Sequence, residues 1–85
     1  MPYETKRVQS FRDVENGKLC YWKTSDGIWF LYVPQVGAGN LDLHDVTEHE
    51  DGTITVSPSI LFQGHEKGER MQVHGFLERG VWRDC

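Results

Sequence analysis

Short apolar runs broken by turn signals constrain the fold of this chain more than any other feature. The runs either alternate apolar with polar residues or are rich in β-branched and aromatic residues, and none sustains a 3.6-residue period. Residues 18–33 predict two strands joined by a glycine-containing turn at 24–27. Because there is no internal repeat and no linker, the pattern predicts an antiparallel all-β domain of six to eight short strands, either a sandwich or a small barrel-like fold.

The segments on either side of this hairpin are less regular. Residues 10–17 predict extended structure or a single helical turn, since a helix-capping pattern competes there with a hairpin-turn pattern. Residues 41–46 and 53–56 predict a second hairpin around the charged turn 48–52. Leu41 and Leu43 stand at alternate positions and are expected to share one face of the first strand.

The C-terminal third predicts two further elements. Pro58 interrupts a strand pattern, which is typical of an edge or a bulge, and residues 60–62 predict a short buried strand. The segment 63–70 is polar throughout and is interpreted as a loop. Residues 71–85 predict a closing hairpin around a turn at 78–80.

Chain length, net charge and cysteine content limit the classes of function that this chain can have. The 85 residues predict one domain, 1–85, with residues 1–9 as its least ordered part. A net charge of −4 argues against direct nucleic-acid binding, which needs clustered Lys and Arg. No run reaches the ~18–20 apolar residues of a membrane span, and no signal-peptide pattern opens the chain. The two cysteines, Cys20 and Cys85, are too few for a disulfide framework, so both are interpreted as free thiols of a cytoplasmic protein.

The densest chemical feature is an acidic segment that contains no Lys or Arg. A solvated acidic face is the simplest interpretation, and a docking surface for a basic partner is the sharper one, because acidic patches steer association electrostatically. A cation site is the third alternative, although the spacing does not fit a calcium loop. The candidate partner-binding residues are Asp42, Asp45, Glu48, Glu50 and Asp51.

The uncharged segment 34–40, PQVGAGN, precedes these acids. Its two glycines could cradle a phosphate, but the segment lacks the Lys-Ser/Thr pair of a phosphate-binding loop and a following helix. A tight turn between strands is therefore the favoured interpretation.

Zinc ligands are present but not in a zinc-binding spacing, since neither a C-x-x-C nor an H-x-x-x-H pair occurs. His74 and Cys85 could meet across the closing hairpin, with one or two further histidines completing a site. As the last residue, Cys85 is poorly placed to be a catalytic nucleophile, so no enzymatic activity is expected. The histidines that could complete it are His44, His49 and His65, and Cys20 is the remaining residue of a ligand type.

The order of motifs resembles a family of small phage, prophage and bacterial proteins known mainly as a domain of unknown function. Members carry a G-x-L-Y strand, a Cys-Pro-Cys-Gly-Cys-Gly type loop, a Pro-Ser-Leu/Ile strand, a Cys-x-x-His-Gly segment and a Gly-x-x-x-x-Cys ending. The corresponding segments of this chain are residues 17–21 (GKLCY), 33–39 (VPQVGAG), 57–61 (SPSIL), 71–77 (MQVHGFL) and 80–85 (GVWRDC).

The resemblance implies a metal site that this chain has lost. Val33, Val36 and Ala38 stand in the cysteine loop, and Met71 stands where another family cysteine would be, so only His74 and Cys85 remain as ligands. A four-ligand site cannot form from these positions. The implied reading is a metal-free descendant that keeps the glycines for backbone shape, with Val33 and Val36 buried and no ion between them.

These observations predict a non-enzymatic accessory protein of phage or prophage origin, without cofactor, in the host cell cytoplasm. Its expected partner is a host or phage protein, and it could inhibit a host defence or replication enzyme. The alternatives are a zinc domain with an altered ligand set and an uncharacterised structural domain. Exposed edge strands in so small a sheet also favour a homodimer.

Overall fold

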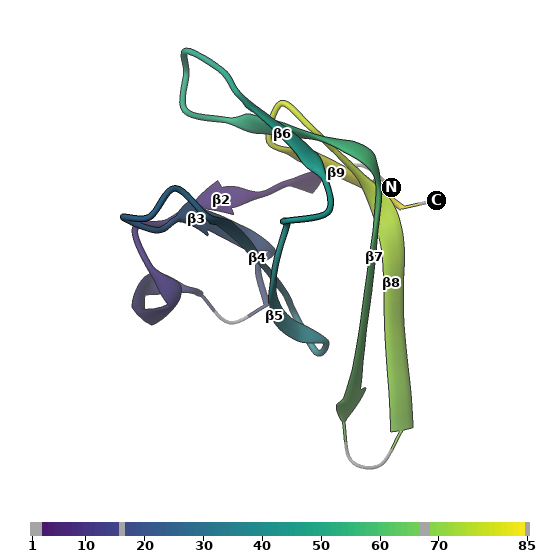
Figure 1. Cartoon of the computed structure of the whole chain (residues 1–85). Helices are drawn as coiled ribbons and strands as arrows, with labels where there is room; N and C mark the ends of the chain where they lie inside the picture. Colours follow the sequence, from purple (N-terminus) through teal and green to yellow (C-terminus); the bar gives the residue numbers. More distant parts are fainter. Residues whose placement is uncertain (1–2, 16, 67–68, 85) are drawn as a thin grey trace.

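Two β-sheets pack face to face around one hydrophobic core (Figure 1). The computed structural model describes residues 3–15, 17–66 and 69–84. These residues form nine strands and one 3₁₀ turn, with no α-helix among them, which confirms the predicted all-β class. No strand ladder connects the two sheets within the described ranges, so of the two architectures left open the fold is a sandwich.

The larger sheet has five strands and the smaller sheet has four. The larger sheet runs in the order β1 (Tyr3–Glu4), β9 (Val81–Asp84), β8 (Glu69–Glu78), β7 (Ile54–Glu66), β6 (Asp45–Glu48). The smaller sheet runs in the order β2 (Lys6–Arg7), β3 (Cys20–Lys23), β4 (Trp29–Val33), β5 (Gly37–Asn40). Neighbouring strands are antiparallel, as expected, except that β2 lies parallel to β3.

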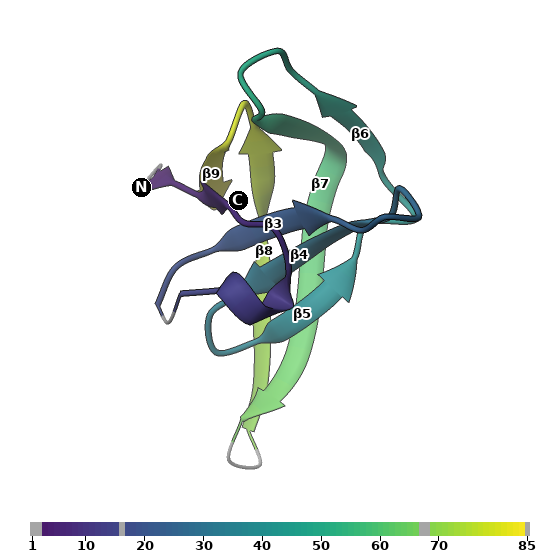
Figure 2. The same cartoon turned by 90° about the vertical axis from the view of Figure 1, so that its left-hand side faces the viewer.

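The core follows from alternation along the strands. In β3, Tyr21 points toward the larger sheet, whereas Cys20 and Trp22 point to the opposite face. That outer face carries a second, smaller cluster, and Phe11 contacts its Trp22. Phe11 belongs to the 3₁₀ turn η1 (Phe11–Asp13), which lies on the outer side of the smaller sheet (Figure 2) and is the second of the two structures predicted for this segment. Cys20 is a free, buried thiol, and Cys85 lies outside the described residues. The main core consists of Leu19, Tyr21, Leu31, Val33, Leu41, Ile54, Val56, Ile60, Leu77 and Trp82.

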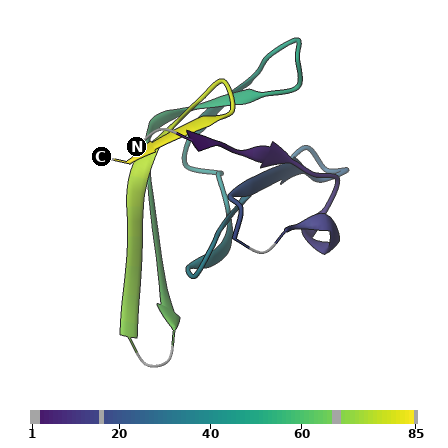
Figure 3. The same ribbon diagram turned by 180° about the vertical axis from the view of Figure 1, so that it is seen from behind.

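The N-terminal segment joins the two sheets. Its first strand, β1, pairs with β9 of the larger sheet, and β2 follows one residue later in the smaller sheet (Figure 3). Between them, the amide and hydroxyl of Thr5 both donate to the Gly80 carbonyl at 2.9 and 2.8 Å. Residues 3–7 therefore form strands in both sheets, although their sequence shows no strand pattern.

The hairpin of β7 and β8 is much longer than the sequence indicates. The pairing register shifts between Val56 and Ile60, around Pro58, as predicted for a bulge. The prediction of a loop over 63–70 is wrong, because 63–66 continue β7 and Glu69 and Arg70 begin β8. The error arises because a ribbon with an exposed outer face accommodates polar residues without burying them. We call residues 60–66 and 69–74 the arm.

Exposure on the arm corrects a second expectation. Residues 60–62 were predicted as a buried strand, yet Leu61 lies on the outer face and is 47% exposed, while Ile60 is fully buried. The side chains alternate because the arm is covered on one face only. Residues 67 and 68 lie outside the described part of the chain.

The segment 34–40 is a turn followed by a strand. The chain turns at 34–36, and the glycines belong to the edge strand β5. Val33 is buried, as predicted, and Val36 is partly buried against the core. A Cβ on Gly39 would lie 3.3 Å from the Phe62 ring, and a Cβ on Gly64 would lie 2.4 Å from the Val36 carbonyl oxygen. Glycines at 39 and 64 thus allow the smaller sheet to approach the arm.

Candidate functional site: the acidic hairpin

The acidic hairpin, residues 42–53, contains every acidic residue proposed from the sequence. β6 and β7 are joined by a turn in which the His49 amide donates to the Thr53 carbonyl at 2.8 Å and the Gly52 amide donates to the His49 carbonyl at 3.0 Å. Asp51 organises this turn, because its Oδ1 accepts hydrogen bonds from the Thr53 hydroxyl at 2.6 Å and the Thr53 amide at 3.0 Å. These two bonds, the hydroxyl first, lower the pKa of the Asp51 carboxyl.

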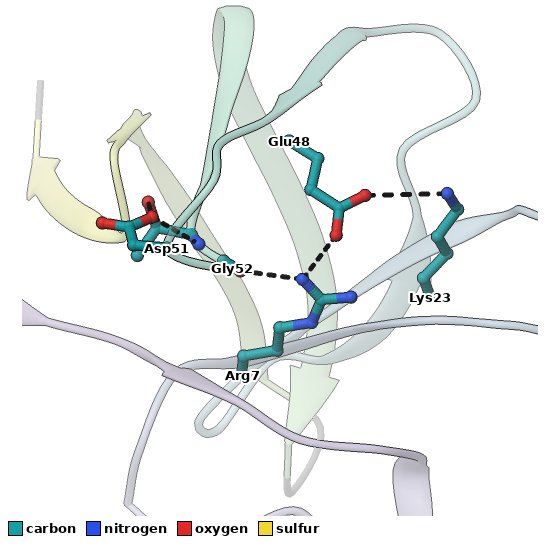
Figure 4. Close-up of polar contacts among 6 residues, drawn as sticks. Arg7, Lys23, Glu48, Asp51 and Gly52 are labelled. Atoms are coloured by element: carbon teal, nitrogen blue, oxygen red, sulfur yellow. Dashed lines mark hydrogen bonds and ion pairs between the residues drawn. The ribbon is translucent and has the colours of Figure 1, made fainter.

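Glu48 connects the acidic hairpin to the smaller sheet (Figure 4). Its Oε2 accepts a hydrogen bond from Arg7 Nη1 at 2.7 Å, and its Oε1 lies 3.7 Å from Lys23 Nζ. The same Arg7 nitrogen donates to the Gly52 carbonyl at 2.9 Å. The hydrogen bond from Arg7 is the main reason why the pKa of Glu48 lies below its ordinary value.

Trp29 lies beside both cations. The Arg7 guanidinium carbon is 5.1 Å from the Trp29 ring centroid, and Lys23 Nζ is 5.5 Å from it, within the range of cation–π attraction. We call this set the Arg7 clamp, formed by Arg7, Lys23, Trp29, Glu48 and Gly52. Because its members come from both sheets, the clamp is a structural contact, and Glu48 is not part of a free acidic surface.

The other carboxylates are not members of the clamp. In β6, Val46 and Glu48 face the smaller sheet, whereas Asp45 lies on the opposite, exposed face. Asp42 and Glu50 are also exposed, and no described Lys or Arg forms an ion pair with these three carboxylates. The predicted set therefore separates into a neutralised Glu48, a turn-forming Asp51 and three outward acids.

An exposed leucine lies beside two of the outward acids, Asp42 and Asp45. Leu43 is 94% exposed whereas Leu41 is buried, so the expectation that Leu41 and Leu43 share one face of a strand is wrong. Residues 42–44 form a turn instead of a strand, closed by the His44 amide donating to the Leu41 carbonyl at 3.0 Å. A local signal was available in Asn40, whose Oδ1 accepts from the Asp42 amide at 3.2 Å, since an Asn before two polar positions is typical of a turn.

The turn that carries Leu43 is fixed at both ends. On one side Leu41 is buried in the main core. On the other side His44 Nε2 lies 3.2 Å from the Ser59 carbonyl oxygen and donates to it, which links the turn to the bulge in β7. We call residues 41–44 the Leu43 turn.

Of the histidines considered as zinc ligands, two meet at the same serine and a third lies elsewhere. His44 and His74 both contact Ser59, the latter through Nε2 and the serine hydroxyl at 2.9 Å, whereas His49 contacts Thr55 at 2.6 Å. Within the described part of the chain, no three His, Cys, Asp or Glu side chains gather in a metal-binding group. Cys85 and the His65 side chain lie outside the described residues, so the pairing of His74 with Cys85 stays a prediction.

The metal loop implied by the resemblance does not fit this chain. Val33, Val36 and Ala38 have hydrocarbon side chains without a lone pair, and Val33 is buried in the main core. Where a family member would have its metal-binding loop, this chain has a turn followed by the edge strand β5, and both pack against the arm.

No helix in residues 3–15, 17–66 and 69–84 has the length and apolar character needed to span a bilayer. No protein-family model matches this chain, and no curated protein or solved structure is significantly similar to it.

Proposed function

We propose that this protein is a non-enzymatic domain that binds another protein through Leu43 and the outward carboxylates around it. The observation that carries the proposal is the nearly complete exposure of Leu43 on a turn fixed by a buried leucine and by a histidine hydrogen bond. The side chain is presented to solvent by the fold and does not lie in a loose chain end.

The side chains of this surface indicate the kind of partner surface that would fit it. An apolar centre surrounded by polar residues is the general anatomy of a protein interface. Here the rim carries negative charge from Asp42 and Asp45, with Glu50 further along the acidic hairpin. A matching partner has an apolar pocket within a basic surface, and the carboxylates would accelerate its approach. Because the turn is already ordered, binding does not carry the entropy cost of ordering this loop.

The resemblance described above favours a host or phage protein as the partner, met in the host cell cytoplasm. In this proposal the domain acts by occlusion: it covers a basic functional surface of a host defence or replication enzyme. The carboxylates would then mimic the negative charge of that enzyme's own ligand. The acidic hairpin supports this proposal because Asp42, Asp45 and Glu50 are exposed and none of them forms an ion pair with a described Lys or Arg.

Capture from a host lysate with quantitative mass spectrometry tests the proposal. Wild-type protein should enrich a specific partner, and Leu43→Ala should lose it, whereas the matched control Leu61→Ala removes an exposed leucine from the arm and should keep it. Replacing Asp42, Asp45 and Glu50 with Lys should abolish capture as well. The near-ultraviolet circular dichroism of each variant reports whether the aromatic core is intact.

A photo-crosslinking residue tests which position of the domain contacts the partner. A photo-reactive amino acid at position 43 should crosslink to the enriched protein, and the same residue at position 61 should not. Equal capture by Leu43→Ala and wild type, or crosslinking only from position 61, would refute the Leu43 turn as the contact surface.

A further inference from the structure

The open edges of the two sheets differ in how they are protected. Natural edge strands commonly carry charge or are very short, which prevents pairing with another chain. β1 and β2 have two residues each, and β6 carries Asp45 and Glu48. β5 is the exception, because its sequence, Gly-Ala-Gly-Asn, has neither a charge nor a proline.

The register of β5 shows which backbone groups are open. The Leu41 amide donates to the Trp29 carbonyl at 2.9 Å, and the next antiparallel pairs are Leu31 with Gly39 and Val33 with Gly37. Hydrogen-bonded pairs alternate along such a ladder, so Gly37 and Gly39 bond toward β4. The amide and carbonyl groups of Ala38 and Asn40 therefore point to the open edge. No described residue forms a hydrogen bond with them there.

We propose that a second copy of this chain adds its own β5 to this edge in antiparallel orientation. Such a pair is related by a two-fold axis, which places the same residues opposite or diagonal to one another. Self-pairing through β6 would bring Asp45 and Glu48 close to their own copies and oppose like charges. Self-pairing through β5 places only Gly, Ala and Asn residues opposite one another, so this edge can pair with its own copy without charge repulsion.

The arm supports the same site. It continues past β5 in both Figure 1 and Figure 2, beyond the point at which Gly64 meets the Val36 backbone. A strand added to β5 would lie alongside the arm and not in open solvent. Partly buried Phe62 and Val73 face this side of the arm. Contact with the arm enlarges an interface that a four-residue ladder alone would leave small.

Analytical ultracentrifugation of the purified chain over about a hundredfold range of concentration tests the proposal, because dimerisation follows mass action. Wild type should shift from monomer to dimer. Ala38→Lys and Ala38→Glu should each raise the dimer Kd by about fivefold at low salt, since cross-strand like charges repel. An equimolar mixture of the two variants should dimerise at least as well as wild type. The matched control, Ser25→Lys at an exposed turn, should leave the Kd unchanged.

A second pair of variants tests the backbone directly. Ala38→Val keeps the edge amide and should remain dimeric, whereas Ala38→Pro removes that donor without removing a bond to β4 and should be monomeric. Wild type that stays monomeric at every concentration, or a dimer whose Kd is indifferent to charge at position 38, overturns the proposal. Leu43→Ala should still dimerise, which separates this inference from the proposed partner surface.

Discussion

The acidic hairpin and the arm share strand β7, and different kinds of contact hold them against the smaller sheet. The acidic hairpin is held by charge, through the Arg7 clamp at the surface. The arm is held by close packing, with Phe62 against Gly39 and Gly64 against the Val36 backbone. Polar contacts of the first kind weaken with salt and low pH, whereas steric contacts of the second kind respond to neither.

This difference separates the roles of the two regions. A surface contact made by exposed side chains can hold the acidic hairpin in place while Asp45, on the opposite face of β6, remains available to a partner. The arm depends on the absence of side chains at two glycines, so it tolerates almost no change on its inner face. We therefore expect substitutions to have their largest effects at the arm and smaller, condition-dependent effects at the clamp.

Gly64→Ala should have the largest effect. Its new Cβ would lie 2.4 Å from the Val36 carbonyl oxygen, which is backbone and cannot move aside as a side chain can. We expect a loss of about 3 kcal/mol in the free energy of unfolding, as for severe overpacking. Gly39→Ala meets only the Phe62 ring at 3.3 Å and should cost about 1 kcal/mol. Urea unfolding followed by tryptophan fluorescence measures both.

An exposed position on the same arm provides the control for this comparison. Gln72→Ala should change stability by no more than about 0.5 kcal/mol. If Gly64→Ala proves as mild as Gly39→Ala, the arm is not held by backbone contact at this point.

Much of the fold could be predicted from local signals. The turn at 24–27, the bulge at Pro58 and the burial of Ile54 and Val56 follow from alternation and turn chemistry, which act over a few residues. The arm could not be predicted in the same way. Residues 63–70 are polar, and only their pairing across a one-sided ribbon explains why they are strands.

The site was less predictable because its parts are far apart in the sequence. The acidic residues were recognisable as a group, but Glu48 is neutralised by Arg7, 41 positions earlier in the chain. No local pattern indicates that contact. Alternation predicted Leu43 to lie on a strand, on the same face as Leu41, and the Asn40 turn that exposes Leu43 has only a weak signal. Local chemistry predicts turns and strands well, whereas long-range pairing decides which charges remain free.

Arg7→Ala should have an intermediate effect. The substitution removes hydrogen bonds to Glu48 and Gly52 together with the contact to Trp29. Since the ion pair is exposed and contributes little, we expect a loss of about 1 kcal/mol, mainly from the carbonyl hydrogen bond and the cation–π contact. Arg7→Lys should recover only part of it, because an ammonium cannot reproduce the planar guanidinium. Because the guanidinium is charged in all three contacts, high salt should reduce this cost in part, whereas it should leave the cost of Gly64→Ala unchanged. A cost that is independent of salt would show that charge does not hold the clamp.

Glu48→Gln should have the smallest effect on stability. The pH dependence of that effect distinguishes the charged contact of the acidic hairpin from the packed contact of the arm. The pKa of Glu48 is lowered in the folded protein, chiefly by the Arg7 hydrogen bond, from an ordinary value of 4.5. A lowered folded pKa means that the stabilisation is present above the unfolded pKa and is lost as pH falls through the folded pKa. Wild type should therefore be more stable than Glu48→Gln at neutral pH, and the difference should vanish as the pH falls below the folded pKa.

The same urea titrations of Gly39→Ala complete the comparison. That variant's deficit arises from packing against Phe62, so it should be equal at neutral and acidic pH. Asp51, whose pKa is also lowered, is present in every protein compared, so its titration cancels in the differences. If the Glu48→Gln deficit persists at acidic pH while the Gly39→Ala deficit does not, the assignment of charge to the acidic hairpin and of packing to the arm is reversed.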